Sequence, residues 1–267
     1  VAEATKALTL YELDLGLNNV VRKWSEPVAR SANKLVPVPG GTDGPGGVLV
    51  CSEGWVSYRR ADHAEVSVPI PRRDDMTGDR GLLIVAAAAH RQRALFFFIL
   101  QSEVGDLYKC TLEHKPDGAV TNLRLQYFDT IAVCNSLCIT KRGLLFAAAE
   151  FGDHALYLFE SLGDDDTDAV CADAIAAGAD PAAIEPPAFR PRALRNLRAV
   201  DRLDSLAPVV DMRVADLAGE GTPQVYALCG RGQQSTLRVL RHGLGVTEVA
   251  VSELPGNPTA VWSGRAG

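Results

Sequence analysis

The chain lacks long hydrophobic runs, a signal peptide and any dense cysteine pattern. Its longest apolar runs, Leu82–Ala89 and Ala94–Leu100, are too short to cross a bilayer. The six cysteines are scattered, whereas a disulfide-rich scaffold shows close and repeated spacings. No charged and apolar leader opens the chain. These absences predict a reduced, intracellular, soluble protein of 267 residues.

Excess positive charge is also missing. The formal net charge is −6 and the pI is about 5.4, while 47% of the residues are hydrophobic and 22% are charged. A domain that binds the phosphate backbone on its own is usually strongly basic. The composition therefore predicts a globular protein that does not bind nucleic acid autonomously, although a local basic patch is compatible with it.

Signatures of catalysis and of phosphate binding are absent as well. Neither a G-x-S-x-G nucleophile elbow nor a His-Glu-x-x-His pair occurs. The glycine-rich run Gly40–Gly47 lacks the Gly-Lys-Ser/Thr ending of a phosphate loop and leads into a strand-like segment. Acidic residues recur beside turns, and this repetition favours a turn-forming role over catalysis; they are Glu53, Asp106, Glu150 and Asp153. We expect no catalytic residue and no enzymatic activity.

Metal sites are not predicted either. Asp164, Asp166 and Asp168 alternate as in a calcium loop, but Ala169 and Ile175 stand where that loop needs Gly and Glu. A solvated acidic loop is the better interpretation. Two cysteines four positions apart, at 134 and 138, lie in a strand-like apolar run with no third ligand near, and the five histidines are scattered. We expect neither metal nor cofactor.

Four similar segments are what the chain does contain. Each has an apolar strand, a short turn and a second strand with an aromatic residue or Leu. They are GVLVCSEGWVSYRR from Gly47, ALFFFILQSEVGDLYKCTLE from Ala94, GLLFAAAEFGDHALYLFE from Gly143 and PQVYALCGRGQQSTLRVLRHG from Pro223. Glycine-containing hairpin turns are expected at Glu53-Gly54, Gly105-Asp106, Gly152-Asp153 and Gly230–Gly232.

The spacing of these segments identifies the fold class. The first three begin 47 and 49 residues apart, and propeller blades of four strands recur at roughly 40–50 residues. The third interval is 80 residues, and its excess coincides with an acidic, Ala- and Pro-rich stretch, Gly163–Pro191. We interpret this stretch as a solvated, poorly ordered insertion. The chain is thus predicted to be all-β, a β-propeller with WD40-like blades, with a large β-sandwich as the alternative.

The apolar strand Leu95–Leu100 should be an inner or central strand of its blade. Its triple Phe96-Phe97-Phe98 does not alternate apolar with polar residues. Both of its faces must therefore be covered, which neighbouring blades would do.

Several strings then resemble one known family across nearly the whole chain. They are YELDLGLN (11–18), VPGGTDGPGGVLVCSE (38–53), PIPRR (69–73), YFDT (127–130), EFGDH (150–154), LGDDD (162–166), LDSLAPVVDM (203–212), CGRG (229–232), LRVLRHGL (237–244) and VSELPGNP (251–258). Together they resemble the splicing-factor 3b subunit 3 family, whose relatives include the large damaged-DNA-binding and cleavage/polyadenylation specificity subunits. The stretch 167–188 matches nothing in that family pattern.

The resemblance implies a fragment of a chain with three propellers. Residues 1–208 would be later blades of the first propeller, with the low-complexity insertion near 163–191. Residues 209–267 would be the closing strand of that propeller and the start of the second one. Such a fragment would leave apolar surface uncovered at both ends, so we expect the chain to associate when it is expressed alone.

The resemblance also implies a function. It is a nuclear, non-catalytic scaffold of the splicing factor 3b complex in the U2 small nuclear ribonucleoprotein, which supports branch-site recognition in pre-mRNA splicing. The implied partners are a large HEAT-repeat subunit and a small companion subunit, with RNA contact at most indirect, no membrane and no small-molecule substrate. Alternatives are the paralogous scaffolds of a cullin ubiquitin ligase or of the 3′-end cleavage/polyadenylation complex. An enzyme with its site at a propeller mouth would need converging ionisable residues, which the sequence does not offer.

One cluster of like charge could contact a partner. It consists of five arginines within thirteen residues, Arg190, Arg192, Arg195, Arg198 and Arg202. Such a cluster could bind an acidic protein surface or RNA phosphate. The alternative, which we weigh more heavily, is a solvated strand face neutralised by the aspartates at 164–166.

Overall fold

A computed structural model describes residues 5–78, 80–92, 95–164, 169–171, 175–176, 184–219, 221–232, 235–243, 249, 251–260, 262 and 264. Almost all regular structure in this part of the chain is β-strand, and its one helical element is the short 3-10 turn η1 (Gly41–Asp43). No helix among the described residues is long and apolar enough to cross a membrane. The predicted all-β class is confirmed.

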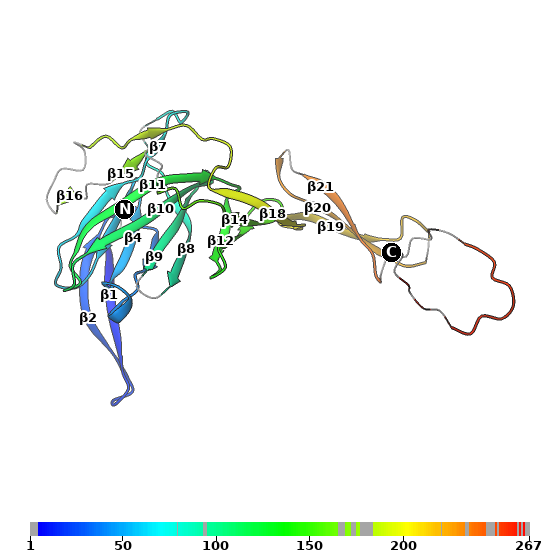
Figure 1. The fold of residues 1–267 in the computed structure, drawn as a ribbon, viewed down its shortest axis with the longest axis horizontal. Coiled ribbons are helices and arrows are strands. Elements are labelled where there is room, and N and C mark those ends of the chain that lie inside the picture. The colour runs from blue at the N-terminus through cyan, green and yellow to red at the C-terminus, as the bar shows by residue number, and fades with distance from the viewer. Residues whose placement is uncertain are drawn as a thin grey trace.

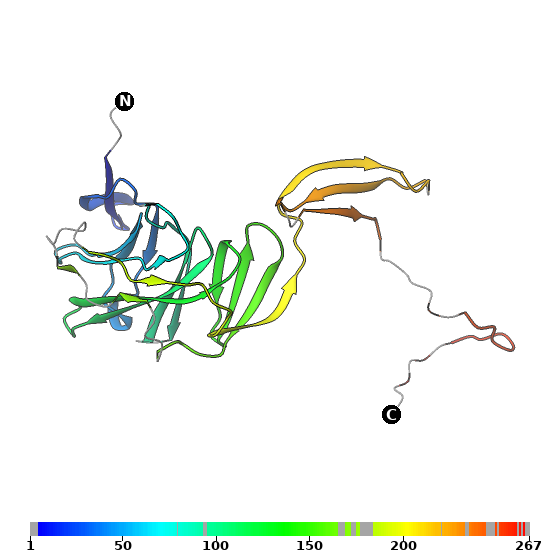
Figure 2. The same ribbon diagram turned by 90° about the horizontal axis from the view of Figure 1, so that it is seen from above.

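Three antiparallel sheets follow one another along the chain, and we call them blades I, II and III (Figures 1 and 2). Blade I contains β3 (Lys34–Pro37), β4 (Val48–Ser52), β5 (Trp55–Arg59) and β6 (Val66–Pro69). Blade II contains β8 (Ile84–Gln92), β9 (Leu95–Ser102), β10 (Asp106–His114) and β11 (Val120–Thr130). Blade III contains β12 (Cys134–Ile139), β13 (Leu144–Ala149), β14 (His154–Phe159) and β18 (Leu197–Leu203). Each is a meander of four strands, the form that the repeat predicted.

The first three repeated segments supply the second and third strands of the blades, namely β4 and β5, β9 and β10, and β13 and β14. The glycine of each expected turn has a positive φ between its two strands, at Gly54, Gly105 and Gly152. Gly105 shows why no other residue fits: its φ is 95°, and an added Cβ would lie 2.2 Å from the carbonyl oxygen of Ile131. The three hairpins are therefore confirmed.

Two apolar clusters lie between the blades, and β9 contributes to both. Phe96, Phe98 and Leu100 pack in the cluster between blades I and II. Phe97 and Ile99 pack on the opposite side of the same strand, between blades II and III. All three phenylalanines are buried, and β9 lies between β8 and β10, so the prediction of a central strand covered on both faces is confirmed.

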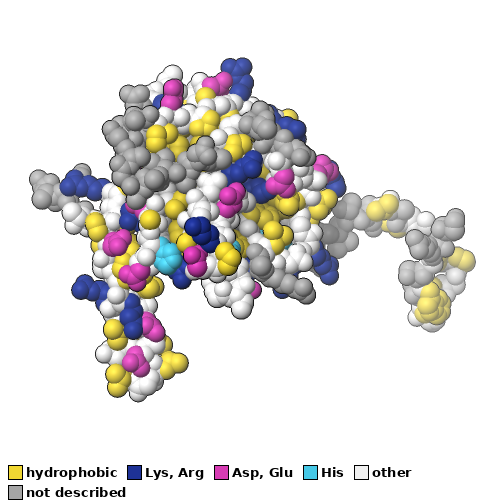
Figure 3. Space-filling model, turned by 60° about the vertical axis from the view of Figure 1, so that its left-hand side comes forward, with side chains coloured by type: hydrophobic (Ala, Val, Ile, Leu, Met, Phe, Trp, Pro, Cys, Tyr) yellow, Lys and Arg dark blue, Asp and Glu magenta, His cyan; other side chains and the backbone are white. Residues whose placement is uncertain are grey.

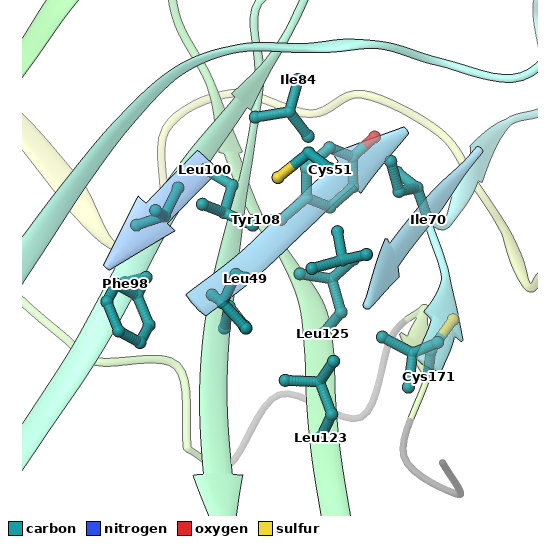
Figure 4. Close-up of a cluster of buried hydrophobic side chains, with 14 of the residues drawn as sticks. Leu49, Cys51, Ile70, Ile84, Phe98, Leu100, Tyr108, Leu123, Leu125 and Cys171 are labelled. Atoms are coloured by element: carbon teal, nitrogen blue, oxygen red, sulfur yellow. The ribbon is translucent and has the colours of Figure 1, made fainter. Parts of the chain in front are cut away.

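Figure 4 shows the first cluster in detail. Leu49 and Cys51 of blade I pack in one cluster with Leu100 and Tyr108 of blade II, and all four are fully buried. At about 25 cal/mol per Å² of apolar area, burial on this scale is what holds two twisted sheets face to face. Packed apolar side chains thus hold blades I and II together.

In the sequence, the stretch 163–191 lies between β14 and β18, the last two strands of blade III. In space, part of it returns to blades I and II. Strand β15 (Val170–Cys171) pairs with β11, and β16 (Ile175–Ala176) pairs with β6. Cys171 is buried in the first cluster, as Figure 4 shows. The buried Cys171 contradicts the expectation of an exposed insertion there, and the two short strands contradict the expectation of poor order, because their backbones pair with blade edges. Residues 165–168, 172–174 and 177–183 lie outside the described part.

Two further sheets lie beside the blades. Strands β1 (Lys6–Asp14) and β2 (Asn19–Val28) form a two-stranded ribbon that projects from the body, with hydrophobic side chains along it (Figures 1 and 3). Strands β19 (Val209–Ala215), β20 (Gln224–Cys229) and β21 (Thr236–Leu240) form a separate sheet after blade III (Figure 2). Its glycine turn at Gly230–Gly232 is the fourth predicted hairpin. The division near residue 208 into two propellers stays a prediction, as does association of the isolated chain.

Candidate interaction site around blade III

Residues 184–197, which we call the returning segment, run along blades I and II before they enter β18. Strand β17 (Ala188–Phe189) pairs in parallel with β7 (Arg72–Arg73). The amide of Arg72 donates to the carbonyl of Pro187, and that of Asp74 donates to Phe189, both at 2.9 Å. These bonds place the returning segment over the loop that links the two blades.

Phe189 is the apolar anchor of this segment. Its ring stacks on Tyr127 with centroids 4.1 Å apart and meets Tyr108 edge-on at 6.1 Å. Only 6% of its surface is exposed. A single aromatic residue between prolines and arginines thus joins the returning segment to the core of blade II.

Asp129, at the end of β11, binds the next part of the segment. Its carboxylate accepts the backbone N–H groups of Arg195, Asn196 and Leu197 at 3.0, 2.9 and 2.8 Å. Burial raises the pKa of Asp129, and these three donors act in the opposite direction because they favour the charged form. The carboxylate therefore fixes the backbone immediately before β18.

The five arginines flagged by the sequence do not form one patch. Arg190 pairs with Asp74 at 3.2 Å, and Arg198 pairs with Glu160 at 2.6 Å. Arg192 turns inward, with its guanidinium 5.1 Å from the centre of the Tyr127 ring. Arg195 is exposed, and Arg202 lies at the far end of β18. The aspartate expected to neutralise them, Asp164, pairs instead with Lys109, while Asp166 lies outside the described residues. Contact of these arginines with a partner or RNA stays a prediction.

Arg202 instead joins a second group of residues. A cavity of about 400 Å³, which we call the notch, lies where blade III meets the β19–β21 sheet; it is lined by Ala132, Phe151, Gly152, Asp153, Ala155, Tyr157, Arg202, Ser205, Ala207, Gly230, Thr236 and Arg238. Arg238 lies 3.5 Å from Asp204, and the guanidinium of Arg231 lies 5.8 Å from the centre of the Phe151 ring. Segments from EFGDH, LDSLAP and CGRG thus meet at one place.

The acidic residues beside the turns also hold other loops. Glu53 accepts the amide of Gly81 at 3.2 Å, and Asp153 accepts that of Ser205 at 3.1 Å. Asp106 is fully buried, with Oδ1 accepting the Thr130 hydroxyl at 2.6 Å and lying 3.8 Å from Arg73. Burial raises the pKa of Asp106. These three carboxylates stand at hairpin turns and also connect distant parts of the chain; that the turns are their main role stays a prediction.

The thiols show no activating environment. All six cysteines are free, and desolvation raises the pKa of Cys51 and of Cys171 to about 12 and that of Cys134 to about 11. A thiol with such a pKa stays protonated at neutral pH and is a poor nucleophile. Within the described residues, no group of three or more His, Cys, Asp or Glu side chains is arranged to hold a metal ion.

Sequence reasoning missed the residues that build this site. Asp129 belongs to the YFDT string, yet nothing in the string shows that its carboxylate binds backbone 66 to 68 residues further on. Phe189 gave the one usable signal, because a lone aromatic residue in a polar stretch is a candidate anchor.

Comparison with known proteins places this architecture. The family model described as the RSE1/DDB1/CPSF1 first beta-propeller matches residues 1–204. Splicing factor 3B subunit 3 of Drosophila melanogaster is 52% identical over 261 residues, which are 97% of this chain and 21% of the relative. Spliceosome-associated protein 130 A of Arabidopsis thaliana is 50% identical over 262 residues, 98% of this chain. Pre-mRNA-splicing factor rse1 of Neurospora crassa is 48% identical over 272 residues. The chain spans about a fifth of the length of these relatives.

Proposed function

Because this chain belongs to the RSE1/DDB1/CPSF1 first β-propeller family, we propose that it is a non-catalytic scaffold of the splicing factor 3b complex. Its role would be to support branch-site recognition by the U2 small nuclear ribonucleoprotein in the nucleus. The observation that carries this proposal is an identity of about 50% to splicing subunits across 97–98% of the chain.

The arrangement of polar groups supports a scaffold. The buried carboxylates described above bind backbone amides, a hydroxyl or a guanidinium within the protein. Four buried thiols have raised pKa values. Groups that are buried and hold parts of the chain together are poorly placed to act as general acids, bases or nucleophiles on a substrate. What the molecule offers a partner is surface on its sheets and ribbons.

The partners we propose are the large HEAT-repeat subunit and the small companion subunit of the complex, with any RNA contact made through them. The net charge of −6 supports the last point, since a protein of this charge gains little from counterion release on RNA. The dispersal of the five arginines supports it further, because they do not form a continuous basic track.

Affinity purification of the tagged protein from nuclear extract tests the proposal. We expect the HEAT-repeat splicing subunit to co-purify, and to remain bound after ribonuclease treatment because the contact is made by protein. The Phe98→Ala variant serves as the negative control. Its disrupted blade packing should abolish binding of the partner. Recovery of a cullin or of polyadenylation factors in place of the splicing subunit would assign the chain to one of the paralogous scaffolds.

A further inference from the structure

The outer strand of blade III has one side that no described strand covers. Strand β18 pairs with β14 and with no other strand among the described residues. Every residue of β18 after Leu197 is exposed. In an antiparallel pair, alternate residues direct their N–H and C=O groups away from the partner strand, so an edge strand can pair with another chain.

Blades I and II have the same edge, and in both of them it is occupied. Strand β16 covers the outer strand β6 of blade I, and β15 covers the outer strand β11 of blade II. Each added strand has only two residues, and both come from the stretch between β14 and β18. The outer edges of these blades therefore accept short extended segments, while the corresponding edge of blade III accepts none from the described part of the chain.

Exposed apolar side chains and the Arg202 guanidinium favour an acidic, partly apolar segment; Asp201 accepts the backbone N–H of Arg202 at 2.8 Å, so that donor is already used and pairing relies on the others. Val200 and Leu203 are 50% and 52% exposed, which gives an added strand apolar surface to contact. Arg202 lies beside them and lines the notch together with Arg238. The Arg202 guanidinium has no hydrogen bond or ion pair to any residue that the structure describes, so its charge is available to a partner.

We propose that an extended acidic segment of a partner protein pairs with the free edge of β18 and places a carboxylate in the notch beside Arg202 and Arg238. Main-chain hydrogen bonds would supply affinity, and the arginines would supply preference for acidic side chains. A peptide fits better than RNA, because an unpaired strand edge offers alternating amide and carbonyl groups that match another backbone. A second copy fits less well, because two β18 strands would bring their arginines together.

The edge can bind such a segment whether or not the protein works in splicing. An experiment that contradicts this proposal therefore leaves the proposed function untouched, and the reverse also holds. It adds a specific attachment point to a scaffold, and its test uses synthetic probes rather than splicing partners.

Two variants separate backbone pairing from charge. The carbonyl of Asn196 accepts the Glu160 amide at 2.8 Å, so this group points toward β14. The amide of Leu197 points away from β14, because it donates to Asp129. Since backbone direction alternates along a strand, the N–H of Ala199 also points away from β14. Ala199→Pro removes that donor at a position where an edge strand tolerates proline. Arg202→Gln removes the charge. Arg213→Gln, on β19 with a side chain that is 83% exposed, is the matched control.

The test is fluorescence anisotropy on the purified protein at low salt, with a labelled ten-residue peptide that alternates Glu and Val. We expect saturable binding, about tenfold weaker binding by Arg202→Gln, no binding by Ala199→Pro and unchanged binding by Arg213→Gln. A peptide that alternates Lys and Val should not bind.

Several outcomes would overturn the proposal. One is equal binding of the Glu and Lys peptides; another is Arg202→Gln binding as tightly as Arg213→Gln. Arg202-dependent binding of decauridine in preference to the peptide would assign the edge to RNA. A dimer that Ala199→Pro dissolves, detected by sedimentation, would assign it to a second copy. If Ala199→Pro lowers the melting temperature, its loss of binding has no bearing on the edge. The proposal is then judged by the preference for the Glu peptide over the Lys peptide and by the effect of Arg202→Gln.

Discussion

Removing the Asp129 carboxylate should release the returning segment and the outer strand of blade III. Asp129 is fully buried and accepts three backbone N–H groups at 2.8–3.0 Å. Two of these donors belong to residues that are themselves only 2% exposed, Asn196 and Leu197. In Asp129→Ala all three donors lose their acceptor at once, and water does not reach the two buried ones without local opening.

The magnitude follows from the number of donors. A buried donor without a partner costs about 1–3 kcal/mol, so two of them cost roughly 2–6 kcal/mol, and local relaxation brings the expected loss to about 3 kcal/mol. Relief of the buried negative charge offsets a part of this loss. For a domain of this size, the change corresponds to a decrease of roughly 6–12 °C in melting temperature. Asp129→Asn should cost less than Asp129→Ala, because its carbonyl oxygen can still accept the amides of Asn196 and Leu197 while its NH2 group meets only the Arg195 donor.

The measurement combines thermal melting with amide hydrogen exchange of residues 190–203. We expect faster exchange from Arg195 into β18, with little change in β9. Asp14→Ala is the matched control, since Asp14 also accepts two backbone amides, at 2.9 and 3.2 Å, but in an exposed turn. Its melting temperature should stay within about 2 °C of the parent. If Asp129→Ala melts like Asp14→Ala and exchange is unchanged, the carboxylate does not fix the segment.

Four further changes test other parts of the structure. Phe98→Ala should cost about 3–5 kcal/mol in urea unfolding because the ring is fully buried, whereas Leu95→Ala, 63% exposed, should change stability by less than about 0.5 kcal/mol. Burial raises the pKa of Asp106, so its contribution to stability is present below the unfolded-state pKa and is lost as pH rises through the folded-state pKa. Asp106→Asn should therefore gain stability relative to the parent as pH increases from about 4 to 7, and a constant difference would contradict this sign. A maleimide should label Cys138 rapidly in the native protein and the five buried cysteines only on unfolding; rapid labelling of a buried thiol would disprove the packing. Met212→Lys, on an exposed sheet, should reduce association in sedimentation experiments, and unchanged association would place the contact elsewhere.

The blades could be predicted from the sequence because their signals are local. A strand, a glycine turn and a second strand lie within about twenty residues, and the interval between such units is set by the length of a blade. The three consecutive phenylalanines of β9 also predicted its central position, since a strand with no polar face must be covered on both sides. These features depend on residues close together in the chain, and the structure confirms them.

The route of the returning segment could not be predicted in the same way. Strands β15, β16 and β17 have two residues each, which is too short for any alternation of apolar and polar residues to appear. Their partners are β11, β6 and β7, so the pairing joins parts of the chain that are far apart in sequence. Low apolar content correctly indicated that the stretch has no core of its own, but it could not show that blade edges would supply hydrogen-bond partners.

The same limitation explains why the arginine cluster was not resolved by sequence. Five like charges in thirteen residues suggested one surface, whereas the backbone changes role in the middle of the run. Up to Leu197 it is bound to blade II by Phe189 and Asp129, and from Arg198 onward it is the outer strand of blade III. Arginines before that point are committed to contacts with the chain itself, such as that of Arg192 with Tyr127. Beyond that point Arg198 still pairs with Glu160, whereas Arg202 lines the notch and its guanidinium makes no hydrogen bond or ion pair with a described residue.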